Sequence, residues 1–147
     1  MSEEGDEARA HEIAAELRVL IGRLRRKLRD QANPGDLTWP QVAVIRHLKD
    51  DVPMTVTALA RAEGVRPQSM GATVAALEEA GFLQSAPDPS DGRQKIYSLT
   101  PRCRDWIGKA RAAREDWLFR AIRAHLSEKE EGELQRGVEL LKRLLDG

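Results

Sequence analysis

Apolar residues recur at helical spacing near both ends of the chain, and the segment between them has a shorter, mixed pattern. From about Ala8 to Arg29 they recur every three or four residues, which predicts an amphipathic helix. Thr100–Pro101 starts a second such helix, expected to run to about His125, and a capping box at Ser127–Glu130 starts a third. Helices of this kind need a surface that covers the apolar stripe. The three stripes consist of Ile13, Leu17, Leu20, Ile21, Leu24 and Leu28; of Trp106, Ile107, Ala110, Ala113, Trp117, Ala121 and Ile122; and of Leu134, Val138, Leu141 and Leu145.

The segment Thr55–Gly81 predicts two short helices joined by a tight turn. Gly64 can supply the left-handed conformation of that turn, and Val65 is expected to follow it as an apolar plug. Arg66 would be the N-cap of the second helix. Pro67 would be its first residue, where a missing N–H costs nothing. A glycine just past the last helical residue then ends this helix.

The second helix has an apolar row on one side and small or polar residues on the other. Met70, Val74 and Leu77 form the apolar row, at positions i, i+4 and i+7. The other side is slim enough to approach a DNA major groove, where Gln or Ser can reach base edges. A helical hairpin packed in a core is the alternative, and the pattern alone leaves both open. The slim side consists of Gln68, Ser69, Ala72, Ala75, Ala76 and Glu79.

Two short strand-like segments, Phe82–Gln84 and Ile96–Leu99, follow these helices. The polar segment Ser85–Lys95 between them predicts a β-hairpin with a long polar tip. A hairpin directly after a helix–turn–helix is the wing of a winged helix. A single Arg on a loop is usually only solvated, but Arg93 near this tip is expected to contact the minor groove or a phosphate.

The pattern as a whole predicts a mainly α protein with a small β-wing (α+β). Its fold would be a winged helix-turn-helix with long N- and C-terminal dimerisation helices. Asn33–Pro34–Gly35 is expected to end the first helix, and a capping box at Thr38–Gln41 to start the central module. The expected parts are an N-terminal dimerisation helix (residues 1–36), a DNA-binding module (37–100) and C-terminal dimerisation helices (101–147). The end helices could fold back on the module. DNA binding would favour their pairing between two chains, because one recognition helix makes few base contacts.

Composition narrows the function classes. A chain of 147 residues suits one compact protomer, and its net charge of zero disfavours indiscriminate coating of nucleic acid. The single cysteine, Cys103, excludes an intrachain disulfide, and the acidic N-terminus lacks the apolar segment of a signal peptide. A cytoplasmic protein without a membrane span is therefore expected. The scattered histidines and the lack of phosphate-loop or nucleophile motifs predict no enzyme, no metal and no cofactor.

The order of several short motifs resembles the MarR family of bacterial regulators, over nearly the whole chain. The resemblance implies a winged helix, a homodimer through the terminal helices, and binding to double-stranded DNA at a pseudo-palindromic operator. It also implies repression as the common mode and release by a small, often aromatic, anionic effector. The motifs are Leu37–Thr38 with Gln41, Leu59–Ala60, Gly64–Val65, Leu77 with Gly81, Pro87–Asp88–Pro89, Asp91–Gly92–Arg93 and Ser98–Leu99–Thr100.

The resemblance also implies which residues meet DNA. It places Arg66, Gln68, Ser69 and Ala72 on the groove-facing part of the recognition helix, and Arg93 at the wing tip. Family members often have Arg where this chain has Ala72 and Ala76, so a smaller phosphate contribution is expected. Oxidant-sensing members have their cysteine near the first helix, so redox sensing is not carried over to Cys103. The full set of predicted DNA contacts is Thr55, Thr57, Arg66, Gln68, Ser69, Ala72, Thr73, Arg93 and Lys95.

Trp39, Trp106 and Trp117 are candidates for an effector pocket between the dimer helices and the winged helix. Large aromatic residues are core or interface anchors by default, and that reading stays open beside the first. A winged helix that binds protein rather than DNA is the alternative function.

Overall fold

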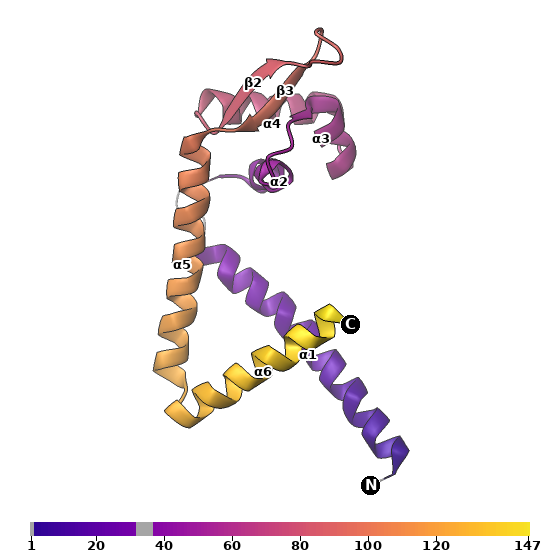
Figure 1. The fold of residues 1–147 in the computed structure, drawn as a ribbon, viewed down its shortest axis with the longest axis vertical. Helices are drawn as coiled ribbons and strands as arrows, with labels where there is room; N and C mark the ends of the chain where they lie inside the picture. The colour runs from indigo at the N-terminus through magenta and orange to yellow at the C-terminus, as the bar shows by residue number, and fades with distance from the viewer. Residues whose placement is uncertain (1, 32–36) are drawn as a thin grey trace. The chain divides into compact units, whose positions relative to one another are not determined.

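The computed structural model describes residues 2–31 and 37–147 and confirms a mainly helical chain with a small sheet (Figure 1). The chain divides into two compact units. For the described residues these are 37–110, called the winged-helix unit below, and 2–31 together with 111–147, called the terminal unit. The predicted break at Asn33–Pro34–Gly35 lies outside the described residues. The elements are α1 (Glu3–Gln31), α2 (Trp39–Leu48), β1 (Met54–Thr55), α3 (Val56–Glu63), α4 (Pro67–Glu79), β2 (Leu83–Pro87), β3 (Lys95–Leu99), α5 (Pro101–His125) and α6 (Glu128–Asp146).

Hydroxyl caps fix where several helices begin. Thr38 Oγ1 accepts from the Gln41 N–H at 3.3 Å, and the Thr38 N–H donates to Gln41 Oε1 at 2.9 Å, so the predicted capping box is present. Thr55 caps α3, and Ser127 caps α6 with a second capping box. At the end of α3, Gly64 adopts φ 67° and ψ 31°, the left-handed conformation that the turn requires.

The three strands form one antiparallel sheet in the order β1-β3-β2. The β2–β3 hairpin runs in register from Leu83↔Leu99 to Pro87↔Lys95. The prediction that the first strand ends at Gln84 is therefore wrong, because β2 continues for three more residues. A proline is tolerated there because β2 is an edge strand and need not donate on its outer side. The hairpin is longer and its tip shorter than expected.

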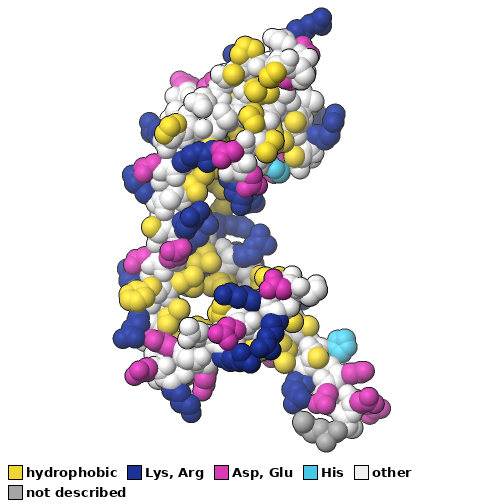
Figure 2. All heavy atoms as spheres, viewed as in Figure 1, with side chains coloured by type: hydrophobic (Ala, Val, Ile, Leu, Met, Phe, Trp, Pro, Cys, Tyr) yellow, Lys and Arg dark blue, Asp and Glu magenta, His cyan; other side chains and the backbone are white. Residues whose placement is uncertain are grey.

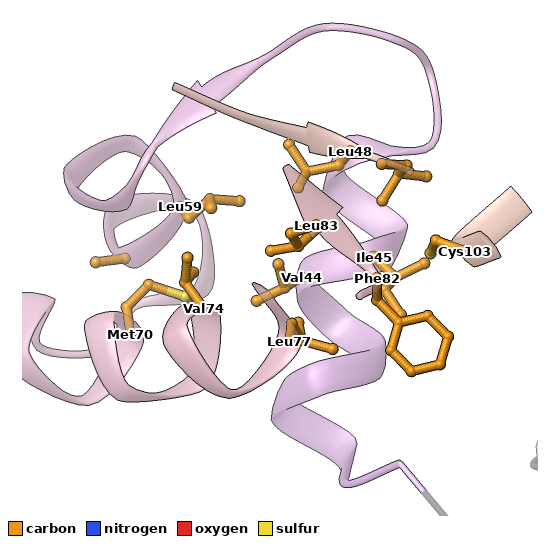
Figure 3. Packing of buried hydrophobic residues seen from close by; sticks show 12 residues of the cluster. Val44, Ile45, Leu48, Leu59, Met70, Val74, Leu77, Phe82, Leu83 and Cys103 are labelled. Carbon is orange, nitrogen blue, oxygen red and sulfur yellow. The ribbon is translucent and has the colours of Figure 1, made fainter. Parts of the chain in front are cut away.

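The core of the winged-helix unit lies between α2, α3, α4 and the hairpin (Figure 3). The row predicted for α4 is buried as expected. Burial of side chains of this size stabilises the fold by about 1.5–3 kcal/mol each. Cys103 from α5 is also fully buried in this core, which is why the compact unit extends past residue 100. The core consists of Val44, Ile45, Leu48, Leu59, Ala60, Met70, Val74, Leu77, Phe82, Leu83, Leu99 and Cys103.

Two local predictions differ from the structure. The side chain of Val65 is 45% exposed, so Val65 is not an apolar plug. The turn at Gly64 is held instead by the backbone, where the Val65 N–H donates to the Ala60 carbonyl at 3.0 Å. Helix α1 begins at Glu3, five residues before the predicted start. Three acidic residues in its first turn suit the positive end of the helix dipole, a signal that apolar spacing does not carry.

The terminal unit leaves its apolar stripes open. Neither α1 nor α6 contains a buried residue. Ile21 on α1 is 52% exposed and Leu145 on α6 is 85% exposed. Apolar side chains are visible among the charged ones on these helices in the space-filling view (Figure 2). Stripes of this kind lack the covering surface that an amphipathic helix needs.

Candidate nucleic-acid interface

Helix α4 presents one exposed face that carries most of the predicted recognition residues. Gln68, Ser69 and Ala72 are exposed on this face, as is Arg66 just before it. The half-buried Thr73 donates its hydroxyl to the Ser69 carbonyl at 3.2 Å. The Thr73 oxygen therefore keeps acceptor capacity only. Because Ala72, Ala75 and Ala76 add no bulk, the backbone of α4 can approach another surface closely.

The beginning of α4 has no side-chain cap, unlike α2, α3 and α6. Arg66 occupies the N-cap with φ −71° and ψ 142°, and Pro67 follows. The first backbone bond is from the Met70 N–H to the Arg66 carbonyl at 3.0 Å, so the earlier amides have no partner within the helix. The first turn contains no acidic residue. This end of α4 therefore has the positive potential that favours an anion.

A compact network shapes the tip of the hairpin. The Asp88 carboxylate accepts from the Ser90 N–H at 3.0 Å and from the Ser90 hydroxyl at 2.8 Å. These two bonds stabilise the charged form and lower the pKa of Asp88. Asp91 Oδ1 accepts from the Arg93 N–H at 3.1 Å, and the Asp91 carbonyl accepts from the Gln94 N–H at 3.0 Å. The tip is thus an ordered turn.

The basic side chains of the hairpin extend into solvent. Arg93 and Lys95 are exposed, and within the described part of the chain the Arg93 guanidinium makes no hydrogen bond or ion pair. Lys and Arg side chains mark the tip of the hairpin in Figure 2. Exposed Arg and Lys are the usual donors to DNA phosphates.

The two predicted threonines before α4 are placed differently. Thr57 is exposed in the first turn of α3. Thr55 is half-buried, pairs with Ile96 in the sheet, and accepts from the Ala58 N–H at 3.1 Å. The structure thus gives Thr55 a clear structural role, and of the two only Thr57 is exposed.

One side-chain contact between α4 and the hairpin has no counterpart in the sequence pattern. The Ser85 hydroxyl of β2 donates to Glu78 Oε2 of α4 at 2.7 Å in a partly buried setting. Seven residues separate the two, and each belongs to a different kind of element, so neither periodicity rule relates them. The contact fastens the wing to α4.

The tryptophans predicted to line a pocket are distributed over both units. Trp106 packs against the winged-helix core, edge-on to Phe82 with ring centres 6.3 Å apart. Its indole nitrogen is buried and, within the described chain, has no hydrogen-bond partner. Trp39 is 54% exposed in the same unit, and Trp117 is half-buried in the terminal unit. Arg102, which the sequence did not single out, lies 5.3 Å from the centre of the Phe82 ring.

Cys103 has no accessible surface, and its burial raises the pKa of the thiol to about 11. A thiol in that state is protonated near neutral pH and is a poor nucleophile. Among the described residues no group of His, Cys, Asp and Glu side chains could hold a metal ion. The same residues include no helix both long and apolar enough to cross a membrane.

Comparison with known proteins relates this geometry to a function. A sequence model described as the MarR family matches residues 37–95, the winged-helix module. The chain is 34% identical over 134 residues to the HTH-type transcriptional regulator MT0903.1 of Mycobacterium tuberculosis, with 91% of this chain and 93% of that protein covered. It is 30% identical over 122 residues to the HTH-type transcriptional repressor Mb2911 of Mycobacterium bovis, covering 80% and 84%.

A solved structure agrees with these sequence matches. A mutant of MepR from S. aureus, bound to an oligodeoxyribonucleotide, superposes on this chain with a TM-score of 0.68 at 17% identity. The superposition covers 90% of this chain and 97% of that chain. At this level of identity the likeness concerns the fold, which matches along most of the chain.

Proposed function

Because the chain belongs to the MarR family of winged-helix, DNA-binding transcriptional regulators, we propose that it represses transcription by binding a pseudo-palindromic operator as a homodimer. As a transcriptional regulator of this family it is not an enzyme. The Mycobacterium bovis relative carries the name of a repressor, which supports the direction of control. The structurally similar MepR mutant was solved bound to an oligodeoxyribonucleotide, which supports DNA as the ligand.

The observation that carries the proposal is the exposed face of α4 beside its uncapped N-terminus. In the major groove, Gln68 and Ser69 would donate to and accept from base edges, while Ala72 would meet a thymine methyl. The amides at the start of α4, with Arg66 beside them, would bind a backbone phosphate. A net charge of zero does not exclude this, because a sequence-specific site needs only local basic groups such as Arg66, Arg93 and Lys95.

The hairpin would make a second contact with the same duplex. Arg93 is held on an ordered tip and has a free guanidinium among the described residues, so it can enter a minor groove or bind its phosphates. Lys95 lies where the tip meets β3 and would add a phosphate contact. Thr57 would contribute a further backbone hydrogen bond, whereas Thr55 and Thr73 would contribute less, because both hydroxyls already bond within the protein.

The open apolar stripes of the terminal unit support the homodimer. Leaving them in water would cost about 25 cal/mol for each Å² that a partner could cover. Ile122, Leu134 and Val138 also line an open groove of about 510 Å³ beside α6. A second copy offers the same apolar surfaces and would bury both sets. It would also present two α4 helices to successive turns of one duplex.

A small aromatic or anionic effector would complete the regulator. Its support is the indole N–H of Trp106, which is buried with no partner among the described residues. An acidic ligand could accept from it, and a donor left unpaired costs about 1–3 kcal/mol. Trp39, in the same unit, would report such a ligand as well. Titration with a panel of aromatic acids, followed by tryptophan fluorescence and by release of DNA, tests this; unchanged fluorescence across the panel contradicts it.

Selection of bound duplexes from a random pool tests the main proposal. The expected product is an inverted repeat whose half-site centres are about 10 base pairs apart, because the two α4 helices would face the same side of the duplex. Enrichment of a single half-site would contradict the homodimer. No enrichment, together with no binding at low salt, would contradict DNA binding and favour a winged helix that binds protein.

A further inference from the structure

Glu78 and Ser85 form a side-chain hydrogen bond between the recognition helix and the wing. The Ser85 hydroxyl, in the middle of β2, donates to Glu78 Oε2, near the end of α4, at 2.7 Å. Both side chains are half-buried. We propose that this pair sets the angle of the wing to α4, and so determines whether Arg93 reaches DNA when α4 occupies the groove. The proposal rests on the DNA binding proposed above.

The pair lies at the last point where the hairpin is fastened to the helix. At the base, the Thr100 hydroxyl donates to the Gly81 carbonyl at 2.6 Å, and the Phe82 N–H donates to the Leu77 carbonyl at 2.9 Å. Beyond Ser85, no described residue from 86 to 95 makes a hydrogen bond or ion pair with α4. β1 also holds the hairpin, through the pairs Met54↔Tyr97 and Thr55↔Ile96, but Ser85 makes the outermost direct polar contact between the wing and α4.

A small change in the angle between β2 and α4 at Ser85 produces a large displacement at the tip of the hairpin. Asp88 lies three positions beyond Ser85 along the chain, which makes an arm of about 10 Å at ~3.3 Å per residue. A rotation of about 10° would displace the end of this arm by roughly 2 Å. Hydrogen-bond distances vary within only about 0.5 Å, so such a shift would remove an Arg93 contact. Loss of the Ser85–Glu78 hydrogen bond can thus weaken the DNA contact of Arg93, although Arg93 does not touch either residue.

The position of Glu78 also indicates a specific role. Two carboxylates, Glu78 and Glu79, stand in the last turn of α4, which contains no basic residue. Negative charge at this end of a helix is unfavourable, because it faces the negative end of the helix dipole. Glu78 is compensated by the Ser85 hydroxyl. Glu79 is exposed and makes no hydrogen bond or ion pair among the described residues, so it serves as the matched control.

Binding to the selected operator, with hydroxyl-radical footprinting and a salt titration, tests the proposal. The disrupting variants are Glu78→Ala and Ser85→Ala, and the preserving ones are Glu78→Gln, which keeps an acceptor, and Ser85→Thr, which keeps the hydroxyl. Glu79→Ala and Ser98→Ala are controls that remove a neighbouring carboxylate and a hairpin hydroxyl. Each is combined with Arg93→Ala.

Glu78→Ala and Ser85→Ala are expected to weaken DNA binding about 3- to 10-fold, because that is the contribution of one charge-assisted contact such as that of Arg93. They should also remove the minor-groove footprint of the wing, and lower the slope of log K against log salt by about 0.9. The base preference at the centre of each half-site should stay. In these variants Arg93→Ala should change affinity less than about twofold, whereas in the preserving variants and controls it should act as in the wild type.

A full wing footprint in Ser85→Ala and Glu78→Ala, with an undiminished effect of Arg93→Ala, overturns the proposal. Equal losses in Glu79→Ala and Ser98→Ala overturn it as well, because they would reveal a general loss of stability. If the wild-type protein gives no footprint on any DNA, the proposed function itself fails. If instead the wild type gives a wing footprint and the Ser85 variants give the same one, only the role of the Ser85–Glu78 pair fails.

Discussion

The backbone N–H of Arg93 donates to the carboxylate of Asp91 at 3.1 Å, so the residue that would enter DNA is held by the residue two positions before it. Asp91 also accepts from Gln94 through its carbonyl, which closes the turn from the other side. The guanidinium itself takes no part in this network. The turn thus fixes the backbone of Arg93 and leaves its charge available.

Substitution of Arg93 should weaken binding to every DNA sequence alike. Arg93→Ala removes one phosphate or minor-groove contact, so the slope of log K against log salt should fall by about 0.9. Fluorescence anisotropy with the operator and with unrelated DNA at several salt concentrations measures both effects. Arg114→Ala, an exposed arginine on α5, is the control and should change neither. An unchanged slope in Arg93→Ala would show that the wing does not meet DNA.

Substitution of Gln68 should instead change sequence preference. Gln68→Ala removes a side chain that would bond to a base edge, so discrimination should relax by about 1–3 kcal/mol at one or two base pairs per half-site. Binding to a set of single-base operator variants measures this. Gln31→Ala, which removes an exposed glutamine at the end of α1, is the control. A loss spread evenly over all positions would argue against base recognition by Gln68.

A charge in the apolar stripe of α1 should dissociate the proposed homodimer. Leu20 is 51% exposed in the protomer, and a partner that covers it would have to bury the new carboxylate of Leu20→Glu. Sedimentation equilibrium should give protomers at concentrations where the wild type is dimeric. Val52→Glu, at a residue of the winged-helix unit that is 63% exposed, should remain dimeric. Dimeric Leu20→Glu would move the interface away from this stripe.

The buried thiol should make the fold less stable in alkali. Burial raises the pKa of Cys103 from 9.0 to about 11, so the unfolded chain releases a proton between these values that the folded chain keeps. The free energy of unfolding should therefore hold its Cys103 contribution below pH 9 and lose about 2–3 kcal/mol of it by pH 11. Urea unfolding at fixed protein concentration measures this. Cys103→Ala should show a shallower decline, and an equal decline would assign the effect to other groups.

The elements that sequence predicted well are those marked by local chemistry. Thr38 and Ser127 each precede a glutamine or glutamate by three residues, and both capping boxes form. Gly64 is left-handed, and the row of Met70, Val74 and Leu77 is buried. Each of these signals lies within about two helical turns, where spacing alone determines which groups meet.

The sequence contains no such local signal for contacts between residues that are far apart along the chain. His47 of α2 pairs with Glu63 of α3 at 2.5 Å, and Arg104 of α5 pairs with Asp51 in the loop after α2. Neither pair follows from periodicity. The extension of β2 to Pro87 was missed because proline usually marks a loop, and only the strand order shows that this strand is at the edge.

The interface itself was only partly predictable. The exposed face of α4 follows from the helical period, and Arg66 at an N-cap, without Ser, Thr, Asp or Asn, was a sign of an uncapped helix. The wing network of Asp88 and Ser90 arises from turn geometry that composition does not determine. The contact of Ser85 with Glu78 required the packing of β2 on α4.

The missing cap on α4 has an evolutionary consequence. Asp or Ser in place of Arg66 would stabilise the helix by about 1 kcal/mol, so selection for thermal endurance alone would favour such a replacement. An aspartate there would also repel the phosphate that the proposed function requires. Homologues under selection for DNA binding should therefore retain Arg66. Duplicated copies that no longer bind DNA should instead acquire Asp or Ser at this position, which caps the helix and makes the fold more stable.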